Sequence, residues 1–344
     1  MIKALNSTNN SSSPGPDGIS YRLLKLLKHT DLGKALLHDI NSYVRDGIPP
    51  NRELTMVMVP KPGKDHRYAK GWRPIVLANT TAKVAEKIIV REIHRLPALH
   101  EVQYGSRPHR NATDCQALYL SIAERTLRSG GRATLLGKDI KSAFNNLSSK
   151  GVLSSLQEAD APDPIKRYVT NFLRPRTFDI GWEGITRGRE SMNKGTIQGS
   201  PISPVLWLIF AARILKMAED NLMGLNTTVR GYNPYQSHPR TIGYLFSYVD
   251  DFNPLIISHQ TSLALHDEAV HQTDLALQEA AAHYEVEWDV SKNTTIHFRH
   301  PAGGNEREKT TKSLGIHISP RFNWLRHISQ RLNLAEKQRA SYTT

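Results

Sequence analysis

The chain has 344 residues, enough for two or three structural units with a large buried core. Its 45 Lys and Arg residues exceed its 32 Asp and Glu residues, which gives a net charge of +13. This excess favours a polyanionic partner, with nucleic acid first. The single cysteine, Cys115, excludes an internal disulfide and a multi-cysteine zinc site. The longest apolar run, residues 205–212, is far shorter than the roughly 18 residues that cross a bilayer.

The first third of the sequence predicts a segment without regular structure, then a hairpin and a helix. Residues 6–18 are rich in Ser, Asn, Pro and Gly, which predicts a flexible entry segment over residues 1–19. Extended patterns at 55–59 and 75–77 flank a turn of Pro, Gly and Lys, which predicts a hairpin with a basic tip. Apolar residues at helical spacing predict a helix over residues 82–96.

The centre of the chain alternates strand and helix patterns. Strands are predicted at 133–140, 243–249, 253–257 and 294–298, and helices at 201–221 and 263–284. The resulting order, β-α-β-β-α-β, is that of a split βαβ unit, in which two helices back an antiparallel sheet. Residues 151–190 interrupt this unit as an insertion. A further hairpin ends near residues 314–318, and the tail from Arg326 predicts helix without a closing element.

Three aspartates are the leading candidates for chemistry. Asp250 and Asp251 fall between two strand patterns, so they lie at a hairpin tip, where an isolated Asp-Asp pair most often serves only the turn. Asp139 ends the strand expected beside that hairpin, which predicts that three carboxylates converge at one sheet edge. Oxygen ligands of this kind suit Mg²⁺, and two such ions would support phosphoryl transfer.

Three segments resemble the central polymerase motifs of reverse transcriptases and occur in the same order. They are residues 138–144 (Lys-Asp-Ile-Lys-Ser-Ala-Phe), 198–204 (Gln-Gly-Ser-Pro-Ile-Ser-Pro) and 248–251 (Tyr-Val-Asp-Asp). The second resembles non-LTR (LINE-type) retrotransposon enzymes more than retroviral ones, and group II intron maturases are near relatives. Further matching segments, between Pro14 and about Gln330, lie at residues 15–19, 60–64, 72–75, 103–108, 291–292 and 314–316.

The resemblance implies an α+β right-hand polymerase with fingers, a split-βαβ (ferredoxin-like) palm and a partial thumb. The expected division is fingers over 20–132, palm over 133–300 with a fingers-type insertion at 151–190, and a primer-grip hairpin with the start of a truncated thumb over 301–344. The implied activity is that of an RNA-directed DNA polymerase, which joins dNTPs to the 3′-hydroxyl of a DNA primer on an RNA template. We expect an intracellular protein, in a nuclear or cytoplasmic ribonucleoprotein, that is neither secreted nor bound to a membrane.

The resemblance also implies roles for individual residues. Two Mg²⁺ ions, for which Mn²⁺ substitutes, are held by Asp139, Asp250 and Asp251, and Lys292 donates a proton to the pyrophosphate. The implied nucleotide-binding residues are Lys61, Arg73, Ile140 through its carbonyl, Phe144 beneath the sugar, Gln198 and Gly199; Lys64 and Arg67 are weaker candidates, and Leu314 and Gly315 form the primer grip.

Simpler interpretations stay open for several of these residues. Phe144 and Leu314 also suit ordinary core packing, and the basic residues before position 74 and Lys292 also suit a solvated surface. The sequence departs from the pattern of the family at Asn145, at Gly137-Lys138 and at Trp288-Asp289. Two other functions remain alternatives: a group II intron maturase-like reverse transcriptase, and a catalytically inactive remnant that binds nucleic acid.

Overall fold

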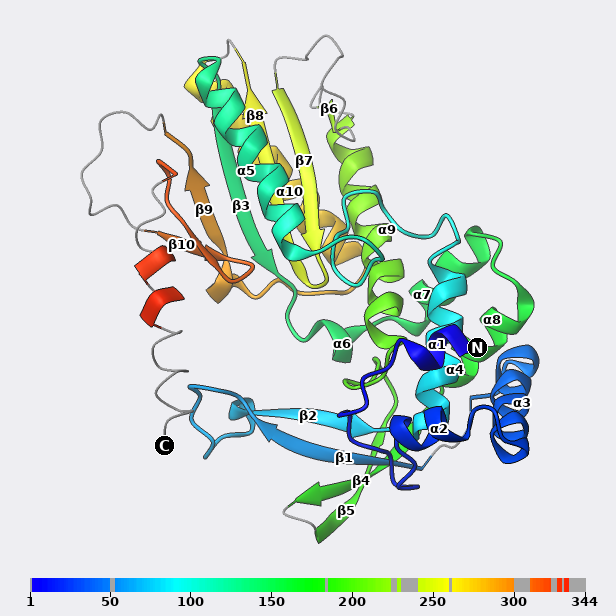
Figure 1. Ribbon diagram of the computed structural model, residues 1–344. Coiled ribbons are helices and arrows are strands. Elements are labelled where there is room, and N and C mark those ends of the chain that lie inside the picture. Colours follow the sequence, from blue (N-terminus) through cyan, green and yellow to red (C-terminus); the bar gives the residue numbers. More distant parts are fainter. Residues whose placement is uncertain are drawn as a thin grey trace. The chain divides into compact units, whose positions relative to one another are not determined.

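The computed structural model describes residues 2–49, 53–182, 185–223, 228–229, 241–259, 262–299, 310–322, 327–329 and 331–333 (Figure 1). The chain divides into two compact units. The first unit comprises Met1–Leu99 and Ser142–Arg213, and the second comprises His100–Lys141 and Ile214–Thr344. Residues 100–132, which we expected to join the fingers, therefore group with the second unit.

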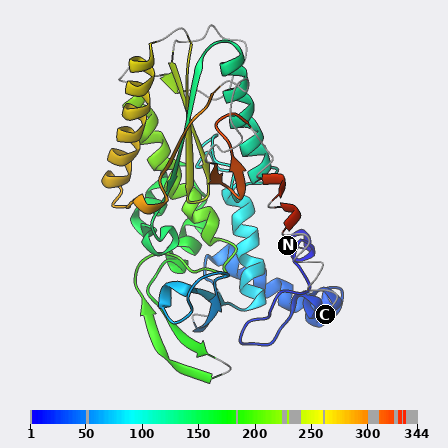
Figure 2. The same cartoon turned by 90° about the vertical axis from the view of Figure 1, so that its left-hand side faces the viewer.

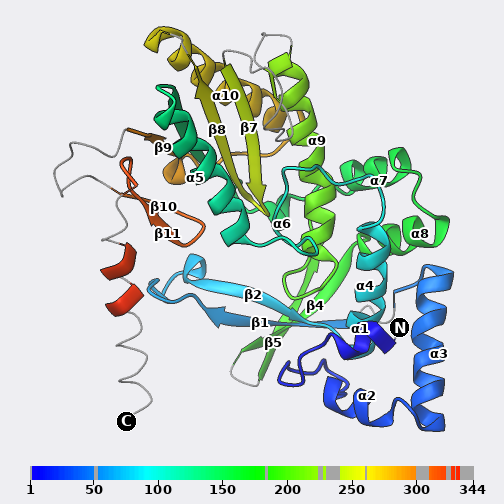
Figure 3. The same cartoon turned by 45° about the horizontal axis from the view of Figure 1, so that its top comes forward.

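The first unit contains a four-stranded sheet in the order β2-β1-β4-β5 (Figure 3). Strands β1 (Glu53–Pro60) and β2 (Trp72–Leu77) pair antiparallel, which confirms the predicted hairpin. Strand β4 (Arg176–Trp182) pairs parallel with β1, and β5 (Ile185–Met192) pairs antiparallel with β4. Half of the strands in this sheet thus come from the segment that the sequence marks as an insertion.

The helices of the first unit begin earlier in the chain than we predicted. Helix α1 (Ile2–Asn6) packs against α2 and α4, and its Ala4 and Leu5 are fully buried. The prediction of a flexible entry segment is therefore wrong for these residues. The side chain of Ser20 caps α2 by accepting a hydrogen bond from the backbone of Leu23. The helices are α1, α2 (Tyr21–Leu27), α3 (Asp31–Asp46), η1 (Ala69–Gly71), α4 (Thr80–Ile93), α6 (Ala143–Asn146), α7 (Ser149–Glu158) and α8 (Asp163–Phe172).

The second unit contains the predicted split βαβ arrangement. Its sheet has the order β6-β7-β8-β3-β9, and the last four strands pair antiparallel. The strands are β3 (Arg132–Asp139), β6 (Thr228–Val229), β7 (Thr241–Tyr248), β8 (Asp251–Ser258) and β9 (Thr294–His297). The connecting helices are α9 (Ser203–Met223) and α10 (Leu263–His283), and the two units divide within α9. A short turn of helix, η2 (Val290–Lys292), precedes β9.

The two faces of this sheet are covered by different elements. Alternate side chains such as Leu135 and Leu255 pack with helix α5 (Ala112–Arg128), whereas Leu136 and Ile256 pack with Ala269 of α10. Figure 2 shows the sheet edge-on between the two helices. Because side chains alternate along a strand, Asp139 and Asp251 share the face that α5 covers.

A C-terminal hairpin lies on the α5 face of the same sheet. Strands β10 (Thr311–Ser313) and β11 (Ile316–Ile318) pair antiparallel, as predicted, and Ile318 is buried in the cluster that contains α5. The predicted start of a thumb after Arg326 lies largely outside the described residues. Within the described ranges, no helix has the length and apolar character needed to cross a membrane.

Candidate active site

The turn between β7 and β8 carries two of the predicted carboxylates. Tyr248 pairs with Asp251, so Val249 and Asp250 form a two-residue turn. Val249 has a φ of +57°. Two-residue hairpins favour positive φ, but a β-branched residue rarely adopts it. The turn is therefore strained and depends on neighbouring structure to hold it.

That neighbouring structure is the segment just before α5. The Tyr104 N–H donates to the Ser247 carbonyl over 2.9 Å, and the Ser247 N–H donates to the Val102 carbonyl over 3.1 Å. A Cβ atom at Gly105 would lie 2.7 Å from the backbone nitrogen of Val249, so this position requires glycine. Residues 103–108 resemble a segment of the family, but no sequence pattern indicates that they support the turn that carries the carboxylates.

The three aspartates lie at one edge of the sheet, as predicted. Asp139 ends β3 directly opposite Asp251, and the Ile140 N–H donates to the Asp250 carbonyl over 3.2 Å. Burial raises the pKa of Asp250, and burial together with the charges of Asp250 and Asp139 raises the pKa of Asp251 to about 7. The carboxylates are therefore close enough to repel one another.

Lys292 joins this edge from η2. Its Nζ lies 2.6 Å from Oδ2 of Asp139 and 3.4 Å from Oδ2 of Asp289, and the hydrogen bond to Asp139 raises the pKa of Lys292. The backbone fixes this approach, because the Asp289 N–H donates to the Asp139 carbonyl over 2.8 Å. The structure thus brings together two residues that the sequence identified separately.

Lys138 is one of the positions at which the sequence departs from the expected pattern. It precedes Asp139 on β3, so its side chain points to the opposite face of the sheet. Its side chain is buried and forms an ion pair with Asp274 of α10. Its Nζ also lies 5.4 Å from the ring centre of Trp288, a favourable cation–π distance. The buried charge is thereby compensated, so the departure at Lys138 leaves the carboxylate edge intact.

The donor set at this edge fits a hard divalent cation. Carboxylate oxygens without sulfur or imidazole suit Mg²⁺ or Mn²⁺ better than zinc. A cation there would also offset the repulsion between these carboxylates, which adds to burial in raising the pKa of Asp250 and Asp251. Among the residues that the structure describes, however, no three His, Cys, Asp or Glu side chains are already arranged as a metal site.

The first unit contains the predicted residues Gln198 and Gly199 in a loop against β2. The Val76 N–H donates to the Gln198 carbonyl over 2.7 Å, and Gly199 has a φ of +108°. A Cβ at Gly199 would lie 2.6 Å from the Val76 carbonyl oxygen. Glycine is therefore required here by the close approach of two backbones. The expected contact of this loop with the incoming nucleotide stays a prediction.

Glu86 on α4 anchors the same loop and was missed by sequence reasoning. It is 3% exposed, and its carboxylate accepts hydrogen bonds from the Ser200 hydroxyl and the Ile202 N–H. Burial raises the pKa of Glu86 to about 7, although these bonds and the charges of Lys83 and Arg176 oppose the rise. The sequence does contain a signal that Glu86 is buried. Glu86 follows Ala82 by four residues and precedes Ile89 by three, so it lies within the apolar stripe of the helix.

Glu86 predicts a pH-dependent stability. A carboxyl group with a folded-state pKa near 7 and an ordinary value near 4.5 stabilises the fold fully below pH 4.5, and this contribution is lost as the pH rises to 7. The difference between these two pKa values corresponds to a free energy of about 3 kcal/mol at most. We expect the free energy of unfolding, measured with denaturant at pH 5 and 8, to fall more for wild type than for Glu86→Gln. Parallel pH profiles for the two proteins would contradict this.

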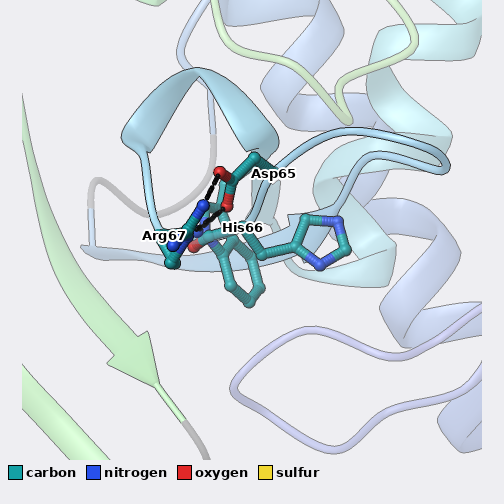
Figure 4. A network of polar contacts seen from close by, with 4 residues as sticks. Asp65, His66 and Arg67 are labelled. Atoms are coloured by element: carbon teal, nitrogen blue, oxygen red, sulfur yellow. Dashed lines mark hydrogen bonds and ion pairs between the residues drawn. The ribbon is translucent and has the colours of Figure 1, made fainter.

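The tip of the β1–β2 hairpin is an ordered loop (Figure 4). The Arg67 guanidinium forms a fork with Asp65, with a shortest distance of 2.7 Å, and Trp72 Nε1 donates to the His66 carbonyl over 2.7 Å. Lys61 Nζ donates to the Lys70 carbonyl over 3.1 Å. The charge of Arg67 is thus already paired within the loop. Of the predicted phosphate-binding residues, Arg73 on β2 is exposed.

Phe144 lies on α6 and is half-buried. Its carbonyl accepts a hydrogen bond from the Thr196 N–H over 2.7 Å, which ties α6 to the segment before Gln198. The site residues that the sequence predicts are divided between the two units. The first unit contains Lys61, Arg73, Phe144, Gln198 and Gly199. The second unit contains Asp139, Ile140, Asp250, Asp251, Lys292, Leu314 and Gly315.

Comparison with known proteins identifies the fold and the family. The chain resembles a solved structure of apo telomerase from Candida tropicalis, truncated from its C-terminal domain, with a TM-score of 0.52, 12% identity, and coverage of 84% of this chain and 59% of that one. The fold is thus that of a right-hand polymerase, as predicted. Residues 59–318 match the family model described as reverse transcriptase (RNA-dependent DNA polymerase). The chain belongs to this reverse transcriptase family.

Curated relatives come from mobile elements. The chain is 26% identical over 209 residues to the RNA-directed DNA polymerase from mobile element jockey of Drosophila funebris, covering 58% of this chain and 22% of that protein. It is 24% identical over 200 residues to the retrovirus-related Pol polyprotein from type-1 retrotransposable element R2 of Popillia japonica, covering 57% and 27%. The chain therefore spans about a quarter of the length of these relatives. The predicted resemblance to non-LTR retrotransposon reverse transcriptases is confirmed.

Proposed function

We propose that this chain is an RNA-directed DNA polymerase domain of a non-LTR retrotransposon. The observation that carries the proposal is the carboxylate edge of the second unit, where Asp139 and Asp251 face each other across the β3–β8 ladder and Asp250 occupies the adjoining turn. Acidic ligands in a protein of net charge +13 suit a site that holds metal while basic surface elsewhere binds nucleic acid.

In the proposed reaction, the 3′-hydroxyl of a primer attacks the α-phosphate of a dNTP and pyrophosphate leaves. Asp139, Asp250 and Asp251 would hold Mg²⁺ or Mn²⁺, which, when bound, activates the attacking oxygen and stabilises the charge on the leaving group. Lys292, held beside Asp139, would donate a proton to the pyrophosphate. The Ile140 carbonyl is a further candidate ligand.

Other residues have proposed roles in binding substrates. Lys61 and Arg73 would bind the triphosphate, Arg73 through a two-pronged contact and Lys61 as a point charge. The Gln198–Gly199 backbone would lie against the incoming nucleotide. Leu314 and Gly315, at the tip of the β10–β11 hairpin, would hold the end of the primer. The template would be RNA, in a nuclear or cytoplasmic ribonucleoprotein.

The proposed position of Phe144 beneath the sugar predicts selection against ribonucleotides. Replacing Phe144 with Val should remove the contact that excludes a 2′-hydroxyl and reduce the preference for dNTPs over rNTPs by roughly 10- to 100-fold. The measurement is the ratio of kcat/KM for dCTP and CTP on one RNA template. An unchanged ratio, with lowered thermal stability alone, would identify Phe144 as a packing residue.

The proposed activity is tested by extension of a labelled DNA primer. We expect extension on an RNA template with dNTPs and Mg²⁺, its loss on addition of EDTA, and its return with Mn²⁺. A protein that binds the primer–template with steep salt dependence, but never extends it, would instead be an inactive nucleic-acid-binding remnant. Activation of intron splicing would favour the maturase alternative.

A further inference from the structure

The β10–β11 hairpin turns sharply at its tip. Leu314 and Gly315 have φ values of 45° and 87°, as expected for a two-residue turn of the type I′ class. Leu314 and Ile316 pack against the cluster of buried residues that α5 shares with the sheet. In Figure 2 the hairpin (red) lies on the side of the sheet that α5 covers. Apolar packing therefore holds the hairpin, including Leu314 at its tip, on this face of the sheet.

Gln116 on α5 binds the backbone where the turn begins. Its side chain is 5% exposed, and Nε2 donates to the carbonyls of Ser313 and Leu314, both over 3.0 Å. A side-chain amide has two N–H groups, and both are used on consecutive carbonyls. Such a pair of bonds fixes both the position and the rotation of the turn.

A second set of hydrogen bonds links the tip to the strand that carries Asp251. The Ser313 hydroxyl donates to Oδ1 of Asn253 over 3.0 Å and therefore accepts from the hydroxyl of Tyr119, which is 3.1 Å away. Tyr119 is fully buried. Asn253 follows Asp251 by two residues on β8, so both side chains lie on the same face.

We propose that Gln116 is a positioning residue for the end of the primer, and that Tyr119, Ser313 and Asn253 couple the hairpin tip to the carboxylate strand. The proposal rests on the proposed function, because it uses Leu314 and Gly315 as the primer-binding tip. No matched motif of the sequence includes Gln116. A tip displaced by about 1 Å would misalign the attacking hydroxyl, and errors of that size cost on the order of 100-fold in rate.

The test compares Gln116→Met, which keeps the side-chain length but donates no hydrogen bond, with Ser121→Ala on the exposed face of the same helix. Hydrogen–deuterium exchange on the unliganded protein is the first measurement. We expect amides of residues 313–318 to exchange at least about tenfold faster in Gln116→Met, with the core of α5 unchanged. Unchanged exchange at these amides would overturn the anchoring role.

Single-turnover extension is the second measurement, with 2-aminopurine as the 3′-terminal base of the primer. For Gln116→Met we expect a 10- to 100-fold lower rate of incorporation, an unchanged Kd for the dNTP, and brighter fluorescence from the misplaced terminal base. Equal rates and equal fluorescence for Gln116→Met and wild type would overturn the proposal.

Two further controls separate the possible failures. If Gln116→Met does not fold, Tyr119→Phe and Ser313→Ala replace it; non-additive rate losses in the double variant would support the coupling, and full rates in both single variants would overturn it. If the wild type itself does not extend the primer, the proposed function fails. The exchange measurement still decides whether Gln116 anchors the hairpin.

Discussion

Replacing Asp250 with Asn should lower nucleotide incorporation by about 1,000-fold or more. The substitution keeps the shape of the turn but removes a charge from the set proposed to hold the metal ions. Bound metal lowers the activation free energy of such reactions by several kcal/mol. Each 1.36 kcal/mol of activation free energy is a factor of ten in rate. The measurement is the rate of single-nucleotide extension on an RNA template at saturating dNTP.

The loss should be catalytic and not structural. Burial and the charge of Asp139 raise the pKa of Asp250, and burial together with the charges of Asp250 and Asp139 raises that of Asp251. Removing the buried charge of Asp250 should therefore leave the melting temperature equal to or above that of the wild type. Primer–template affinity should stay within a few-fold. Asp220→Asn, at an exposed position of α9, is the matched control and should extend normally. Normal extension by Asp250→Asn would remove that residue from the metal site.

Gly105→Ala should be nearly as damaging, although Gly105 bears no functional group. The added methyl carbon would lie 2.7 Å from the Val249 nitrogen and 3.2 Å from the Tyr248 carbonyl carbon, so the backbone of the turn must shift. Asp250 would shift with it. Because a displacement near 1 Å can cost on the order of 100-fold, we expect a 10- to 100-fold slower incorporation rate.

The control for this substitution lies on a strand of the same sheet. A Cβ at Gly243 in β7 would meet Thr273 Oγ1 at 3.8 Å, which is an ordinary contact distance. Gly243→Ala should therefore extend primers at close to the wild-type rate. Comparable losses for both glycine variants, or none for Gly105→Ala, would show that the turn does not depend on this contact.

The elements of the second unit could be predicted because their signals are local. Periodicity located β3, β7, β8 and α10 to within two residues, and the order of the elements fixed the sheet topology. The pairing of Asp139 with Asp251 follows from that topology. These features follow from the alternation of side chains within single strands and from the known split βαβ arrangement. They can therefore be predicted from the sequence alone.

The missed features depend on contacts between distant segments. The parallel pairing of β1 with β4 places Glu53 opposite Thr177. No local sequence pattern indicates that a strand so far along the chain pairs with β1. Helix α1 is only five residues long and is held by packing, since so short a helix is not stable alone. Glu86 appears in the sequence as one more helical acid, and its partner Ser200 is 114 residues away.

The interleaved division of the chain has a consequence for synthesis on the ribosome. The first unit needs residues on both sides of the 100–141 segment, because β1 has no partner on one edge until residues 176–182 have been made. At 5–20 residues per second, we expect this edge to stay unpaired for roughly 6 to 25 seconds after β1 emerges. An unpaired strand edge is a site for aggregation, so chaperones that shield nascent strands should raise the yield of folded protein.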